Sequence, residues 1–309
     1  SMPYMSQRDR DDIIFGAQQG FDFIAASFVR TAQDVYDIRN LLNEYDSDIR
    51  IIAKIENQEG VSNLREILAE ADGVMVARGD MGVEIPFERI PAIQKMIIRK
   101  VYSAGKVVVT ATQMLESMIT NPRPTRAEIT DVANAIYDGT SAIMLSGETA
   151  MGAHPVEAVQ TMASIAATTE EDIDYKVRFS NVYPAPLTKN ITSAIGHATV
   201  TTAHDLGAAA IVTVTQSGTT ARMISKYRPD VPIIGATTEE KVLHQLMLSW
   251  GVVPVRCVRQ DNTDALFDHA VEVGRTTGLI HPDDIVVITA GIPLGASGTT
   301  NMLKVQTVR

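Results

Sequence analysis

The sequence predicts an α/β protein with two domains. Short apolar runs rich in isoleucine and valine alternate with longer segments in which apolar residues recur at helical spacing. This alternation is typical of βαβ units and of a parallel sheet. A polar stretch with two prolines interrupts it at residues 174–189, after which it starts again, and 309 residues suffice for about two domains.

The first domain is expected at residues 1–173 and opens with a helix. Ser6 is a residue type that caps helices, and acidic residues and apolar positions at helical spacing follow it. Strands are expected at residues 23–28, 51–55, 73–76, 107–111 and 142–145. Helices are expected at residues 32–42, 62–69, 91–103, 126–137 and 155–168. From alternation alone, these elements fit an open doubly wound sheet as well as an eightfold βα barrel.

The second domain is expected at residues 190–309, after a linker at residues 174–189. Helices are expected at residues 191–206, 220–227, 239–248 and 263–277. Strands are expected at residues 209–214, 232–236, 252–258, 284–289 and 300–308. The same alternation again indicates a compact α/β domain.

Polar residues follow two neighbouring strands of the first domain. Lys54 and Glu56 are two residues apart and therefore share a face of their strand, and Asp80 follows the next strand. Two carboxylates can hold Mg²⁺ or Mn²⁺, and a fixed ammonium beside them can neutralise charge that develops during a reaction. The competing interpretation is a solvated surface ion pair, which contributes little.

Longer motifs surround these residues. They are IIAKIENQEGV at residues 51–61, VARGDMG at 76–82, ATQMLESM at 111–118, PTRAE at 124–128, DVANA at 131–135 and MLSGETA at 144–150. In this order they resemble the pyruvate kinase family. The resemblance favours the barrel: it implies a partial (β/α)8 TIM barrel, the last five strands, followed by the family's smaller C-terminal α/β domain. The family's first three barrel strands and its lid domain have no counterpart in these residues.

The resemblance implies phosphoryl transfer from phosphoenolpyruvate to ADP, which gives pyruvate and ATP in glycolysis. By resemblance, Glu56 and Asp80 hold Mg²⁺ or Mn²⁺, and Lys54 stabilises the transition state. Thr112 is expected near the face of the enolate where the proton arrives. The further substrate contacts implied are those of Ser27, Arg78, Gly79, Asp80 and Thr112.

Other parts of the family's site are not carried over. The family's K⁺ ligands and its nucleotide-binding residues belong to the N-terminal strands without a counterpart here. We therefore expect the 309 residues to bind metal with pyruvate or oxalate and to form no ATP alone. A metal-dependent lyase or aldolase that stabilises an enolate is an alternative. A regulatory or assembly module without catalysis is another.

The second domain has its own candidate site. A loop rich in hydroxyl groups lies between a predicted strand and a predicted helix, where free backbone N–H groups favour an anion. The resemblance implies an allosteric effector there, either a sugar phosphate or a nucleotide. An ordinary helix cap beside a flexible loop is the alternative. The expected effector residues are Thr215, Ser217, Gly218, Thr219, Thr220, Gly295 and Gly298.

Composition narrows the class of protein. A formal net charge of -10 and a pI near 5.1 argue against a nucleic-acid partner. The single cysteine cannot form an internal disulfide, which fits a cytoplasmic location. No apolar run reaches the roughly 18 residues of a membrane span. The resemblance also implies a homo-oligomer, which in the family is a homotetramer.

Overall fold

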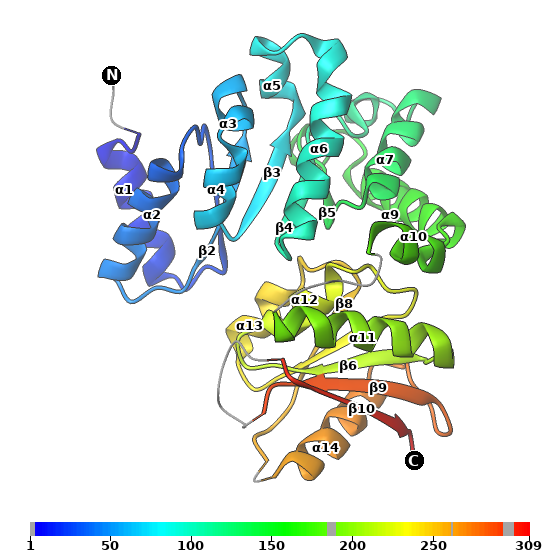
Figure 1. Ribbon diagram of the computed structural model, residues 1–309. Helices are drawn as coiled ribbons and strands as arrows, with labels where there is room; N and C mark the ends of the chain where they lie inside the picture. The colour runs from blue at the N-terminus through cyan, green and yellow to red at the C-terminus, as the bar shows by residue number, and fades with distance from the viewer. Residues whose placement is uncertain (1–3, 184–189, 261, 293–299) are drawn as a thin grey trace. The chain divides into compact units, whose positions relative to one another are not determined.

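The computed structural model describes residues 4–183, 190–260, 262–292 and 300–309. The chain forms two compact units, Ser1–Ile173 and Asp174–Arg309. Each unit has its own sheet with helices packed around it, as the alternating pattern predicts (Figure 1). Among the described residues, we find no helix with the length and apolarity that a bilayer span requires.

Unit 1 contains five parallel strands in the spatial order β1-β2-β3-β4-β5. Their bounds are β1 Phe23–Ala26, β2 Arg50–Ile55, β3 Gly73–Ala77, β4 Val107–Ala111 and β5 Ala142–Met144. Each strand pairs in parallel with the one before it. A doubly wound sheet reverses its strand order at a switch point, whereas a barrel adds strands in one direction. The observed order is therefore that of a partial barrel.

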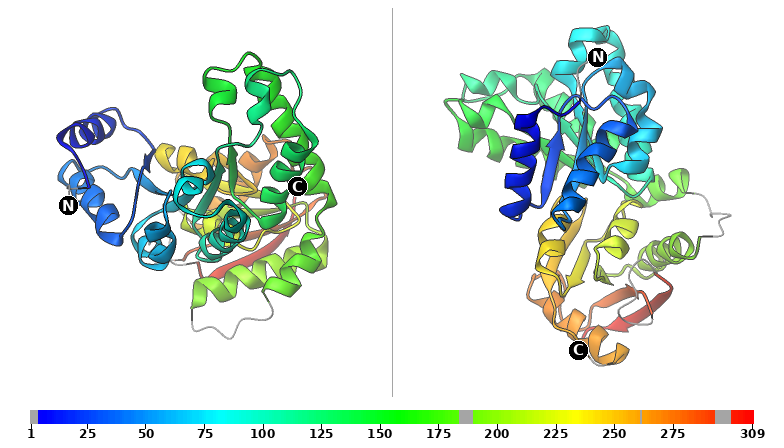
Figure 2. Two further views of the ribbon diagram at one scale, coloured as in Figure 1. Left: turned by 90° about the horizontal axis from the view of Figure 1, so that it is seen from above. Right: turned by 90° about the vertical axis from the view of Figure 1, so that its left-hand side faces the viewer.

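Helices flank the strands of unit 1 (Figure 2). Three of them begin with reciprocal capping boxes, formed by Ser6 with Asp9, Thr31 with Asp34, and Thr125 with Glu128. Both β3 and β4 are buried along their whole length, which explains why they are continuous apolar runs. The helices are α1 Gln7–Gln18, α2 Ala32–Glu44, α3 Gln58–Ser62, α4 Leu64–Glu70, α5 Arg78–Glu84, α6 Ile90–Ser103, α7 Arg126–Asp138, α8 Gly147–Ala150 and α9 Pro155–Asp172, with the 3₁₀ turns η1 Phe87–Arg89 and η2 Glu116–Ile119.

Two helical segments of unit 1 differ from the prediction. The helix expected at residues 62–69 is α4, and a further short helix, α3, precedes it and ends at Ser62. The short helix α5 starts directly after β3 and lies outside the ranges given above as helical. Glycine lowers helix propensity, and Gly79 and Gly82 hide this helix from a pattern-based prediction. Its position matters because it carries Asp80.

Unit 2 contains a mixed sheet in the order β10-β9-β6-β7-β8. Four strands are parallel, and β10 runs antiparallel to β9 at the edge. Along β6, Ala210 and Val212 face one core with Phe267 of α14, while Ile211 faces the other core with Val200 of α11. The unit is therefore a three-layer α/β/α domain. Its elements are α11 Ile191–Leu206, β6 Ala210–Val214, α12 Thr219–Ser225, β7 Ile233–Thr237, α13 Glu240–Leu246, β8 Val252–Arg256, α14 Thr263–Arg275, β9 Ile285–Ala290 and β10 Met302–Thr307.

The segment predicted as a linker contains a helix. Helix α10 spans Tyr175–Val182, and Asp174 caps it by accepting a hydrogen bond from the Val177 N–H. Phe179 of α10 is buried, with its ring centroid 4.9 Å from that of His197 on α11. The prediction of a linker at residues 174–183 is thus wrong, because a single buried aromatic per eight-residue helix leaves little periodic signal. Residues 184–189 lie outside the described residues.

Candidate active site

The predicted pair at the end of β2 is formed. The Lys54 ammonium lies 2.6 Å from Glu56 Oε1 and donates a hydrogen bond of 3.0 Å to the Ser27 hydroxyl. The Glu56 side chain is 1% exposed, and that of Lys54 is 23% exposed. A buried carboxylate is costly without partners, so this pair is an organised site rather than a solvated surface contact. The structure therefore brings Ser27, Lys54 and Glu56 together.

The second partner of Glu56 could not be predicted from residue types. Phe28 has a positive φ of 54°, and its backbone N–H donates to Glu56 Oε2 at 2.6 Å. A bulky residue in the left-handed region is strained. The hydrogen bond to a buried carboxylate offsets this strain and turns the chain at the end of β1. Both Glu56 oxygens are thus fixed, one by a charge and one by the backbone.

A second group of polar atoms lies where β3 and β4 end. The Gly79 N–H donates a hydrogen bond of 2.8 Å to the Thr112 hydroxyl, which in turn donates to the Ala111 carbonyl at 2.6 Å. Thr112 and Gln113 both have positive φ, 67° and 55°. The structure therefore brings Gly79 and Thr112 together, as the substrate prediction requires. The same geometry shows that the Gly79 N–H has a partner within the chain.

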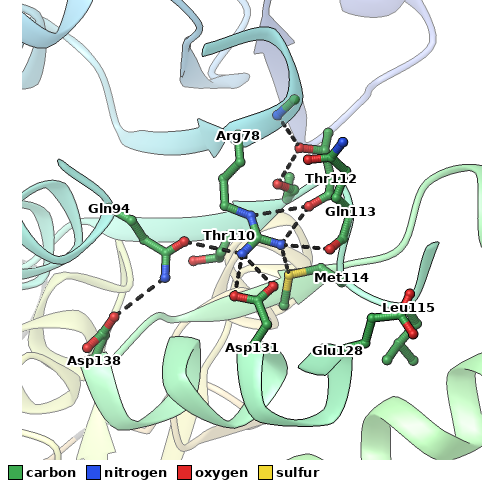
Figure 3. Close-up of polar contacts among 12 residues, drawn as sticks. Arg78, Gln94, Thr110, Thr112, Gln113, Met114, Leu115, Glu128, Asp131 and Asp138 are labelled. Carbon is green, nitrogen blue, oxygen red and sulfur yellow. Dashed lines mark hydrogen bonds and ion pairs between the residues drawn. The ribbon is translucent and has the colours of Figure 1, made fainter. Parts of the chain in front are cut away.

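The Arg78 side chain is buried inside unit 1 and reaches the backbone carbonyls of Thr112 and Gln113. Its guanidinium is buried and contacts backbone carbonyls of β4's end and the carboxylate of Asp131 on α7 (Figure 3). The substrate contact that the resemblance implies for Arg78 stays a prediction. Asp131 lies 53 positions further along the chain, and no sequence signal pairs it with Arg78.

Asp80 lies in the first turn of α5, and its side chain is exposed. Because Ile55 pairs with Val76, Glu56 and Asp80 follow neighbouring strands at the same edge of the sheet. Within the ranges that the structure describes, no group of three or more His, Cys, Asp and Glu side chains is arranged to bind a metal. Two carboxylates with water and substrate oxygens are nevertheless a common way to bind Mg²⁺.

The predicted effector loop is closed by internal hydrogen bonds. The Ser217 and Thr219 hydroxyls are 2.9 Å apart, and the Thr220 hydroxyl lies 2.9 Å from that of Thr300. Thr215 is buried and follows β6. Gly218 has a φ of 77°, a conformation that glycine adopts at little cost. Gly295 and Gly298 lie outside the described residues.

Arg222 also belongs to this loop, although it was not predicted. Its guanidinium donates to the Ser217 carbonyl and to the Thr219 hydroxyl, each at 3.1 Å. Its position on α12, one turn after the loop, is a sequence signal that could have been used. The positively charged Arg222 guanidinium therefore lies beside the hydroxyl groups that are expected to bind a phosphate.

Comparison with known proteins agrees with this arrangement. The family model described as pyruvate kinase, barrel domain, matches residues 1–159, and the one described as pyruvate kinase, alpha/beta domain, matches residues 193–306. The chain belongs to the pyruvate kinase family. The partial barrel of unit 1 and the α/β domain of unit 2 are accordingly the two domains of that family that the chain contains.

Curated relatives named pyruvate kinase match along the whole chain. That of Clostridium acetobutylicum is 52% identical over 308 residues, which are 99% of this chain and 65% of the relative. That of Geobacillus stearothermophilus is 54% identical over 309 residues, 100% of this chain and 52% of the relative. That of Lactobacillus delbrueckii subsp. bulgaricus is 51% identical over 309 residues, which are 99% of this chain and 52% of the relative. The chain thus spans between about half and two thirds of the length of these pyruvate kinases.

Proposed function

We propose that the chain carries the part of a pyruvate kinase active site that holds the divalent cation and the enolate. One observation supports this most directly: Lys54 and Glu56 form a buried ion pair at the edge of the sheet where Asp80, Gly79 and Thr112 also lie. Family membership gives the reaction class, phosphoryl transfer between phosphoenolpyruvate and ADP. The geometry of these residues supports their assignment to the site.

The reaction needs positive charge along the path from the transferring phosphoryl group to the enol oxygen. The bond between phosphorus and the enol oxygen of phosphoenolpyruvate breaks, and a bond from phosphorus to a terminal oxygen of ADP forms. The electron pair stays on the enol oxygen, and C3 of the enolate then takes a proton to give pyruvate. Lys54 supplies a compact charge for the oxygen that becomes negative. Ser27 and Glu56 hold that ammonium in place.

The donor set at this edge fits a divalent cation. Glu56 and Asp80 supply hard oxygen ligands, and Glu56 Oε1 already holds one cation, the Lys54 ammonium. A bound Mg²⁺ or Mn²⁺ would act as a Lewis acid that polarises the transferring group and the enolate oxygen. Gly79 has no side chain and would let the substrate carboxylate approach the backbone closely, and Thr112 would complete the pocket from the next strand.

Calorimetry tests this proposal on the polypeptide itself. We expect oxalate, a planar dianion that resembles enolpyruvate, to bind in the presence of Mg²⁺ and not in its absence. A coupled assay with phosphoenolpyruvate and ADP should detect no ATP from these 309 residues alone. Absence of Mg²⁺-dependent oxalate binding would contradict the proposed site. Full turnover would contradict the expectation that residues outside this chain hold the nucleotide.

We also propose that the Thr215–Thr220 loop binds the phosphate of an allosteric effector. The Arg222 guanidinium beside the Ser217 and Thr219 hydroxyls supports this, because charge and hydroxyl donors together favour a phosphate. We expect one of fructose bisphosphate, ribose 5-phosphate or AMP to raise the melting temperature of unit 2. At a ligand concentration of about 100 Kd the gain is about 2.7 kcal/mol. T219V should remove it, and equal effects of all three and of free phosphate would oppose an effector site.

The remaining properties are proposed on family membership alone. They are a requirement for K⁺, assembly into a homotetramer and a cytoplasmic location. Each is a property of the whole enzyme, of which this chain spans a part.

A further inference from the structure

The segment that follows β4 has an energetically unfavourable backbone conformation. Thr112 and Gln113 both occupy the left-handed region, at φ of 67° and 55°, and neither is a glycine. Such a conformation costs about 1–2 kcal/mol per residue. Strain of this kind persists where the surrounding structure over-determines it. We therefore expect neighbouring groups to hold the backbone of these two residues in this conformation.

The Arg78 guanidinium supplies that fixation. It donates to the Thr112 carbonyl from Nε at 3.2 Å and from a terminal nitrogen at 2.7 Å, and to the Gln113 carbonyl at 3.1 Å. Its other terminal nitrogen contacts both Asp131 oxygens, at 2.7 and 2.6 Å (Figure 3). Arg78 is 8% exposed. A planar fork with five donors can satisfy these acceptors together, whereas an ammonium cannot.

The next residue in the chain holds the same threonine by its side chain. Gly79 follows Arg78, and its N–H donates to the Thr112 hydroxyl at 2.8 Å. Two consecutive residues directly after β3 thus donate hydrogen bonds to Thr112, one to its carbonyl and one to its hydroxyl. If the carbonyl is released, the backbone of Thr112 can leave the left-handed region, and the hydroxyl then leaves the Gly79 N–H.

We propose that Arg78 and Asp131 form a positioning pair that fixes Thr112 in its strained conformation and so aims its hydroxyl at Gly79. Asp131 orients the guanidinium from α7, and Arg78 transmits that orientation to the two carbonyls. Neither side chain touches substrate in this role. The benefit for catalysis rests on the proposed function, because it requires Thr112 and Gly79 to line the enolate site. The positioning itself does not.

Amide exchange at Gly79 tests the positioning directly. In a chain labelled with ¹⁵N-glycine, the Gly79 signal is assigned by its loss in G79A, since a Cβ there would lie 3.5 Å from the Thr112 hydroxyl and is tolerated. T112V should abolish protection of this amide. D131N, which preserves shape and removes the charge, should speed its exchange at least 10-fold. R78K, which preserves charge and removes the fork, should do the same.

A matched carboxylate on the same helix gives the control. Asp138 ends α7, pairs with Lys95 and reaches Arg78 only through Gln94, by two long hydrogen bonds of 3.5 and 3.4 Å, so D138N should change Gly79 exchange far less than D131N does. The functional readout is Mg²⁺-dependent exchange of the pyruvate methyl protons with D₂O, the reverse of enolate protonation. D131N should slow the exchange of the pyruvate methyl protons at least 10-fold. It should change the affinity for Mg²⁺-oxalate by less than about 3-fold, because Lys54 and Glu56 are unchanged.

The outcomes separate this inference from the proposed function. Unchanged protection of Gly79 in D131N and R78K would overturn the positioning pair, whatever the chain does with pyruvate. Equal loss in D131N and D138N would overturn it too, because the effect would then be general loosening. Absence of pyruvate exchange in the unmodified chain would count against the proposed function, while the amide result would still decide the positioning.

Discussion

E56Q is expected to weaken Mg²⁺-dependent oxalate binding at least 100-fold. The carboxylate is the buried ligand of the proposed metal site and holds the Lys54 ammonium at 2.6 Å. A glutamine can still accept from the Phe28 N–H, yet it removes the charge that both cations require. Its amide group would also face the ammonium as a second donor. A 100-fold loss corresponds to about 2.7 kcal/mol.

An exposed glutamate three positions on provides the control. Glu59 lies on α3, and E59Q should leave oxalate binding within about 2-fold of the unmodified chain, as a surface charge contributes little. Calorimetry with Mg²⁺ and oxalate gives both affinities, and thermal melts confirm that each variant is folded. Equal affinities for E56Q and the unmodified chain would place the metal elsewhere and remove Glu56 from the site.

The sequence was sufficient for the parts of the site that follow local rules. Lys54 and Glu56 share a face because strand residues two apart always do, and their ion pair confirms it. Thr112 and Gly79 follow the ends of adjacent strands and therefore meet. The barrel, in contrast, was chosen by family resemblance, and the one-directional strand order now supports it independently.

The parts that could not be predicted depend on distant residues or on backbone conformation. The guanidinium of Arg78 meets Asp131, which is 53 positions away and carries no periodic relation to it. Phe28 adopts a positive φ that its residue type disfavours. Its backbone N–H then donates a hydrogen bond to the Glu56 carboxylate, which stabilises this conformation. Tertiary contacts override local preference at both places, and both places lie at the candidate site.

Helix α10 shows the same limit in the fold. Residues 174–189 look like a linker because they contain two prolines and scattered polar residues. What makes the first half helical is the docking of Phe179, whose ring meets those of His197, His204 and Tyr227 at centroid distances of 4.9, 5.3 and 6.0 Å. Short helices gain most of their stability from such packing rather than from propensity.

F179A is therefore expected to destabilise unit 2 by about 3 kcal/mol, within the range for buried aromatic residues replaced by alanine. The substitution removes the ring that joins α10 to α11 and leaves a cavity among aromatic neighbours. Trp250 is the single tryptophan of the chain, and it lies in unit 2, with its ring 5.3 Å from that of Tyr175 on α10. Its fluorescence in urea therefore follows the unfolding of this unit.

Val177 is the matched position, since it lies on α10 and is 54% exposed. V177A should change the free energy of unfolding by less than about 0.5 kcal/mol, because exposed positions contribute little. If α10 were a linker, the two variants would have the same midpoint in urea. A large loss for F179A alone would make α10 part of the folded domain, so that the cooperative unit begins near Asp174 rather than at residue 190.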